Sequence, residues 1–140
     1  MDILRAVPPF RGFLERSLAC LSHEAPLAYA RTCETLASRA IRADVDGEVV
    51  PVRFTRERAR VLDEEPARAA VSLRTSRRAI LDLLDARCTL VEAVLDDRFF
   101  LAGAPDDLVA FHDGFTAYLH GAVRSPSLPD LLAEYRRTDR

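Results

Sequence analysis

The chain has 140 residues and is 49% hydrophobic, and its 20 basic residues, all arginine, nearly balance 22 acidic residues. This length is enough for one domain with a hydrophobic core and too short for two ordinary domains, so we expect a single domain over residues 1–140. A molecule so close to neutral lacks the positive field that attracts nucleic acid, which excludes DNA and RNA as expected partners.

The cysteines and the apolar runs indicate the compartment. Cys20, Cys33 and Cys88 are odd in number and far apart, a pattern that fits neither a disulfide framework nor a zinc site. We therefore expect reduced thiols and no metal. Residues 1–10 contain no signal-peptide core, and no later run approaches the ~18 consecutive apolar residues that span a bilayer. The sequence predicts a soluble cytoplasmic protein.

Residues 1–40 are expected to form an N-terminal helical hairpin. After Pro8 and Pro9, apolar residues recur at helical spacing in a first helix, and Pro26 suits the first turn of a second. The apolar positions of the two helices are, in order, Phe10, Phe13, Leu14, Leu18 and Leu21, then Leu27, Ala30, Cys33, Leu36, Ala37 and Ala40. We interpret this hairpin as scaffold, and a lid or a transient contact with a membrane surface is the alternative.

From Ile41 the apolar period changes from helical to two, which is typical of strands. Asp46 and Gly47 form a favoured two-residue turn between strands at 41–45 and 50–54. Pro51 cannot donate to a ladder, so the second strand either lies at an edge or presents that position outward. Further strands are expected at 59–62 and 69–75.

Two capped helices follow the strand at 69–75. Thr75 or Ser76 caps a leucine-rich helix, and Thr89 with Glu92 has the spacing of a capping box for a short second helix. The predicted inner face of the short helix comprises Leu90, Val91, Val94 and Leu95.

A strand at 98–103 and two helices complete the chain. Phe99 and Leu101 are expected on one side of this strand and Phe100 on the other. Pro105 begins a long helix with an apolar stripe, Tyr118 lies at the edge of that stripe, and a last short helix is expected at 130–137. The stripe consists of Leu108, Phe111, Phe115, Leu119 and Ala122.

The middle of the chain resembles the sterol carrier protein type-2 domain, a small fold that encloses lipids. The matching residues are Val71, Leu73, Thr75 and Ser76 in one strand and cap, Ile80 to Leu84 in the leucine-rich helix, and Arg98, Phe99, Leu101 and Gly103 in the last strand. The resemblance is strongest over residues 69–115, weaker back to Ile41, and absent before residue 40. Asp97 and Ala86 or Arg87 stand where the family usually has glycine, Ala104 where it has Asp, and Ala70 where it often has Asp.

The resemblance implies an α/β (α+β) fold with about five strands in an antiparallel-rich sheet, covered on one face by helices and preceded by the helical hairpin of residues 1–40. It also implies non-covalent binding or transfer of a lipid, sterol-like, quinone or polyketide molecule in a cavity between sheet and helices, without a cofactor. Transferred to this chain, the ligand-binding residues are Val71, Leu73, Ile80, Leu84, Val91, Leu95, Phe99, Leu101, Phe111, Phe115 and Leu119. Each of them also suits an ordinary dry core.

Two other functions remain open from the sequence. If the protein is an enzyme, His112 and Asp113 on the long helix are the candidates for cofactor-free acid/base chemistry, such as cyclisation or isomerisation of a hydrophobic natural product. Otherwise Phe100, on the sheet face opposite the core, is a candidate contact for a protein partner or a second copy of the chain.

Overall fold

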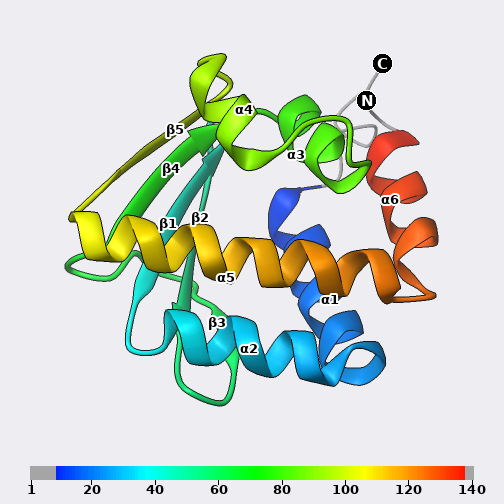
Figure 1. Cartoon of the computed structure of the whole chain (residues 1–140), viewed down its shortest axis with the longest axis horizontal. Coiled ribbons are helices and arrows are strands. Elements are labelled where there is room, and N and C mark those ends of the chain that lie inside the picture. Colours follow the sequence, from blue (N-terminus) through cyan, green and yellow to red (C-terminus); the bar gives the residue numbers. More distant parts are fainter. Residues whose placement is uncertain (1–8, 138–140) are drawn as a thin grey trace.

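The computed structural model describes residues 9–137, so the expectations for the N-terminal segment up to Pro8 and for the last three residues lie outside the described residues. Figure 1 shows a sheet with helices packed against one of its faces. The elements are α1 (Phe10–Glu24), α2 (Pro26–Leu36), β1 (Ala40–Val45), β2 (Glu48–Phe54), β3 (Ala59–Val61), β4 (Val71–Thr75), α3 (Arg77–Leu84), α4 (Leu90–Leu95), β5 (Phe99–Gly103), α5 (Pro105–Arg124) and α6 (Leu128–Arg137).

The sheet has five strands in the order β3-β2-β1-β4-β5. β1 and β4 pair in parallel and the other neighbours are antiparallel, which confirms the predicted antiparallel-rich α+β sheet. Asp46 and Gly47 have φ values of 53° and 91°, so both central residues of the β1–β2 turn are left-handed. This conformation matches the right-handed twist of the two strands and fixes their register.

The inner face of the sheet is apolar because alternate side chains of each strand point to the helices. Its buried members include Ile41, Val45, Val50, Val52, Phe54, Val71, Leu73 and Phe99. Pro51 lies on the outer face of the interior strand β2, which confirms the outward alternative predicted for it. The crossover from β3 to β4 passes over that outer face, where Glu65 accepts a hydrogen bond from Arg42 Nε at 2.9 Å.

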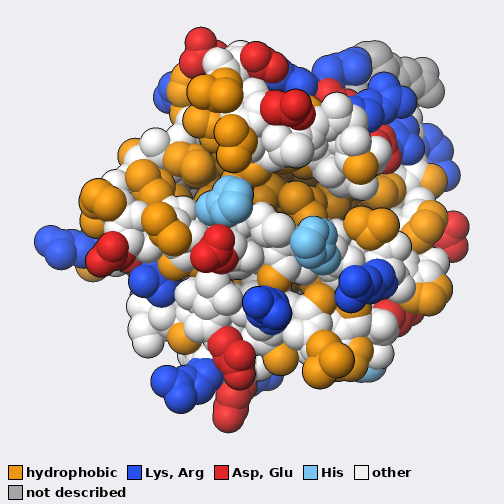
Figure 2. Space-filling model, viewed as in Figure 1, with side chains coloured by type: hydrophobic (Ala, Val, Ile, Leu, Met, Phe, Trp, Pro, Cys, Tyr) orange, Lys and Arg blue, Asp and Glu red, His pale blue; other side chains and the backbone are white. Residues whose placement is uncertain are grey.

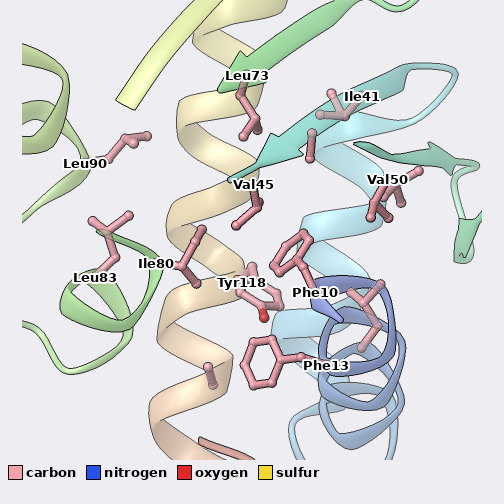
Figure 3. Close-up of a cluster of buried hydrophobic side chains, with 14 of the residues drawn as sticks. Phe10, Phe13, Ile41, Val45, Val50, Leu73, Ile80, Leu83, Leu90 and Tyr118 are labelled. Carbon is pink, nitrogen blue, oxygen red and sulfur yellow. The ribbon is translucent and has the colours of Figure 1, made fainter. Parts of the chain in front are cut away.

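The helical hairpin is part of the core. The Glu48 carboxylate at the β1–β2 turn accepts hydrogen bonds from the backbone N–H groups of Phe10 and Arg11, at 2.7 and 3.0 Å. A carboxylate at a helix N-terminus satisfies free N–H groups and complements the helix dipole. This contact holds the first turn of α1 against the sheet, and the apolar side chains of α1 join those of the strands in one buried cluster (Figure 3).

The predicted apolar face of the second helix was partly wrong. Leu27 is 87% exposed and Ala30 is also exposed, whereas Thr32, Cys33 and Leu36 are buried. Leu27 and Ala30 lie on the side of α2 that faces away from its packing partners, whereas Ala28 in the same part of the helix packs against α5. The helix ends at Leu36, which leaves Ala37 in the connection and Ala40 as the first residue of β1.

α5 crosses α2 at close range because two of its residues are glycines. A Cβ added at Gly114 would lie 2.6 Å from Leu36 Cγ, and one added at Gly121 would lie 2.7 Å from the Ala28 Cβ. α5 therefore has two buried sides, one against α2 and one facing the sheet. Tyr118 is buried on the second side although we predicted it at the edge, and Leu119 is only half-buried.

Both predicted caps are present in the α3–α4 region. The Ser76 hydroxyl accepts from the Ala79 N–H at 3.1 Å, and Thr89 forms a capping box with Glu92. Ala86 and Asp97 have φ values of 60° and 59°, at the two places where the family resemblance leads us to expect glycine. These residues flank α4 and keep the glycine-like turns, at the expense of backbone strain at Ala86, whereas aspartate tolerates this conformation.

The predicted inner face of α4 was partly wrong as well. Leu90 and Ala93 are buried, but Val91 is 52% exposed and Leu95 is 75% exposed. β5 follows the prediction, since Phe99 is buried and Phe100 is on the outer face, where the Arg74 guanidinium lies 4.9 Å from the centre of its ring. The last helix begins at Leu128, two residues before the predicted start.

Candidate functional site

A small apolar pocket of about 90 Å³ lies between the inner face of the sheet and the helices α1, α2, α3 and α5, and all the surface that lines it is apolar. Its lining residues come from four helices and four strands: Phe10, Leu14, Leu18, Thr32, Leu36, Ile41, Ala43, Val52, Phe54, Leu73, Ile80, Phe99, Phe111, Gly114, Phe115 and Tyr118. In Figure 2, apolar side chains line a hollow between α5 and the α3–α4 segment.

Aromatic rings of α5 form one wall of the pocket. The rings of Phe111 and Phe115 stack with centroids 5.4 Å apart, and Phe115 and Tyr118 stack at 5.9 Å. Phe99 of β5 meets Phe115 in a tilted arrangement at 6.0 Å. Spacings of three and four residues place the three rings of α5 on one side of the helix, so this part of the wall follows from the helical periodicity of the sequence.

The hydroxyl groups next to the pocket are occupied by the protein itself. Tyr118 donates to Ser17 Oγ at 2.8 Å, and Ser17 in turn donates to the Leu14 carbonyl at 3.0 Å. The Thr32 hydroxyl donates to the Ala28 carbonyl at 2.9 Å. Figure 3 shows the Tyr118 side chain between Ile80 and Phe10. Burial raises the pKa of Tyr118 to about 12, so this hydroxyl stays protonated at neutral pH.

About half of the ligand-binding residues predicted from the sequence line the pocket. Leu73, Ile80, Phe99, Phe111 and Phe115 line it. The remaining predicted residues do not: Val71, Leu84, Leu101 and Leu119 pack beside it, and Val91 and Leu95 are exposed. Val71 in particular is completely buried, on β4 between β1 and β5.

Sequence reasoning missed the lining residues contributed by the hairpin and by the first two strands. Phe10, Leu14 and Leu18 were predicted as one apolar helical face, and Ile41 and Val52 as inward strand positions, but none was assigned to the ligand. The family resemblance does not extend to residues before 40, so it gave no reason to bring α1 to the pocket. The apolar periodicity of α1 was the available signal.

His112 and Asp113 lie elsewhere. His112 Nδ1 is 3.1 Å from Asp113 Oδ1, both side chains are exposed, and both line a surface groove between α2 and α5. Among the described residues that line the apolar pocket, the Tyr118 hydroxyl is the sole ionisable group. The described residues contain no cluster of His, Cys, Asp or Glu able to hold a metal ion. Burial raises the pKa of the Cys33 thiol, which keeps it protonated and unreactive.

The helices of the described part of the chain are too short or too polar to cross a bilayer. The sequence matches no known family model and no curated protein at a significant level. The fold, in contrast, is similar to solved structures. A structure described as the UbiJ-SCP2 ubiquinone synthesis protein superposes with a TM-score of 0.60 at 16% identity and covers 83% of this chain and 97% of its own.

Two further structures share this arrangement. Sterol Carrier Protein 2 Like 2 from Aedes aegypti has a TM-score of 0.52 at 10% identity over 74% of this chain and 97% of its own. Protein TT1886 from Thermus thermophilus, described as possibly a sterol carrier protein, has a TM-score of 0.51 at 13% identity over 95% of this chain and 91% of its own. The chain thus has the fold of sterol carrier protein 2.

Proposed function

We propose that the protein binds a hydrophobic small molecule non-covalently and transfers it. The observation that carries this proposal is the pocket between sheet and helices, because its lining surface is apolar throughout. Water inside such a space has no hydrogen-bond partners, so an apolar ligand either replaces the water or fills an empty cavity. Each Å² of apolar area that the ligand buries contributes about 25 cal/mol to the free energy of binding.

The geometry favours a ligand with an apolar tail. The neighbouring hydroxyls of Ser17, Thr32 and Tyr118 already donate their protons within the protein, so a carbonyl or carboxylate head group finds no donor inside. Burying that head group without a partner costs about 1–3 kcal/mol or more. The tail therefore occupies the pocket and the head group remains at the surface. Among the expected ligands, this favours a quinone with an isoprenoid tail or a fatty acyl compound over a rigid sterol.

The names of the similar structures support a hydrophobic ligand in general, since one is a ubiquinone synthesis protein and another a sterol carrier protein. At about 90 Å³ the pocket is smaller than the roughly 150 Å³ engineered cavity that accepts benzene. On this proposal the pocket therefore widens when a tail enters.

The experiment has two arms. Organic extraction of the purified protein followed by mass spectrometry identifies any co-purified lipid, and titration with the fluorescent fatty acid cis-parinaric acid measures binding directly. We expect saturable binding that is lost in Ala43→Leu, since Ala43 is buried and lines the pocket and the larger side chain fills it.

Ala102→Leu is the matched control, because Ala102 is exposed on the outer face of the sheet. It should bind cis-parinaric acid like the wild type. Equal binding by Ala43→Leu and the wild type, or the absence of saturable binding by the wild type, would show that the pocket does not hold the ligand.

A further inference from the structure

α4 has an unusual surface for so short a helix. Five of its residues are apolar and Glu92 is the sole polar one, a composition normally found in helices that are buried all round. Only Leu90 and Ala93 are buried, while Val91 and Leu95, which are four residues apart and share one side, are exposed. Figure 2 shows apolar side chains gathered over α4 and continuing into the hollow between α4 and α5.

The segment that contains α4 is anchored at both ends. Before it, Asp85 at the end of α3 pairs with Arg136 at 2.7 Å. Asp82 of α3 also pairs with Arg98 at 2.5 Å, directly before β5. The base of the segment is thus fixed to α6 and to the sheet.

The two joints of the segment are the left-handed residues Ala86 and Asp97. Ala86 follows α3 and Asp97 follows α4, and both are in the left-handed region, which strains an alanine more than an aspartate. Backbone hydrogen bonds hold both turns, from the Arg87 N–H to the Asp82 carbonyl and from the Arg98 N–H to the Ala93 carbonyl, each at 2.8 Å. A rotation at these positions breaks those bonds and releases the strain at Ala86. Between these positions, the Thr89–Glu92 capping box supplies hydrogen-bond acceptors for free backbone N–H groups at the start of α4. Both side chains belong to the segment itself, so the helix keeps its form when the segment moves.

The segment also adjoins the pocket without closing it. Phe99 lines the pocket and follows Asp97 by two residues, and Ile80 of α3 lines it from the other side, but no residue between 86 and 97 does. A pocket of about 90 Å³ has to widen for an alkyl tail, and α4 is the neighbouring element that has a left-handed residue at each end and exposed apolar side chains.

We infer that residues 86–97 form a lid, which swings about Ala86 and Asp97 to admit the ligand tail and then closes on it with Val91 and Leu95. This inference rests on the proposed function. It makes Val91 and Leu95 ligand contacts of the loaded state, and it selects ligands whose tails are long enough to extend from the pocket to α4.

The test compares two double variants in a titration with cis-parinaric acid. Val91→Ser/Leu95→Ser removes the exposed apolar side chains of the lid. Val109→Ser/Val123→Ser is the matched control, since these two side chains are 62% and 73% exposed on α5. We expect the lid variant to bind about tenfold more weakly than the wild type with an unchanged Tm, and the control to bind like the wild type.

Hydrogen exchange provides the second readout. Bound cis-parinaric acid should slow the exchange of the α4 amides in the wild type and leave it unchanged in the lid variant. Equal affinity of the lid variant and the wild type, or equal weakening in both double variants, overturns the lid while the carrier proposal stands. Absence of binding by the wild type overturns both.

Discussion

The close crossing of α2 and α5 predicts the effect of Gly121→Ala. The new Cβ would lie 2.7 Å from the Ala28 Cβ and 3.0 Å from Leu21 Cδ2, whereas carbon atoms in contact lie about 3.5–4.0 Å apart. Ala28 cannot rotate its methyl group away, so α2 and α5 must separate by about 1 Å. Overpacking of this kind costs about 1–3 kcal/mol, and removing a glycine from a helix returns about 1 kcal/mol.

Because a whole helix has to shift, we expect the cost at the upper end of its range and a net loss of about 1–2 kcal/mol in the free energy of unfolding. This corresponds to a fall of about 3–6 °C in Tm. Urea denaturation followed by circular dichroism measures it. Gly12→Ala is the control, since a Cβ at Gly12 has no atom within 4 Å, and it should gain about 0.5–1 kcal/mol. If Gly121→Ala gains stability as Gly12→Ala does, the two helices are not closely packed.

Three further predictions concern single groups. Ala86→Gly removes the strain of a left-handed alanine, about 1–2 kcal/mol, but increases the conformational entropy of the unfolded chain, which costs about 0.4–1 kcal/mol. Thermal unfolding should therefore show a net gain of about 0.5–1 kcal/mol in the free energy of unfolding. A loss of stability would argue against strain at Ala86. Ser17→Ala leaves the buried Tyr118 hydroxyl without its acceptor and should cost about 1–3 kcal/mol, most of which the double variant Ser17→Ala/Tyr118→Phe should restore; an equally unstable double variant would contradict this account. Burial raises the pKa of Tyr118 and of Tyr135 to about 12, above the unfolded value of 10, so the unfolded chain loses these protons first and stability should fall as pH rises from about 10 to about 12. Tyr118→Phe should reduce that fall in denaturation curves recorded across this range, and an unchanged pH dependence would show that Tyr118 does not cause it.

Local signals in the sequence were sufficient for the order of the elements. The capping residues Ser76 and Thr89 and the Asp46–Gly47 turn act through neighbouring backbone groups, so their effect is visible without the tertiary structure. The resemblance to the sterol carrier family correctly joined the strand at 71–75, the two helices and the strand at 99–103 into one fold.

The errors occur where a helix contacts more than one neighbour. A single apolar stripe was predicted for α5, but Gly114 and Gly121 provide a second contact face through the absence of a side chain, which a hydrophobic pattern does not register. For α4, the pattern could not tell a buried apolar face from an exposed one. Which residues meet across the pocket also depends on the position of α1, and that is set by the contact between Glu48 and the N-terminus of the helix.

The parallel pairing of β1 with β4 also affects how the chain folds. β1 and β2 meet across a two-residue turn, but Ile41 must find Val71 after the intervening chain has crossed over the sheet. Closing that loop lowers the entropy of the chain before the β1–β4 contacts stabilise it. We therefore expect the β1–β2 hairpin to form early and the β1–β4 pairing to form late. The apolar inner face of the sheet stays exposed until α5 packs against it. We therefore expect a chain truncated before residue 105 to aggregate through this face.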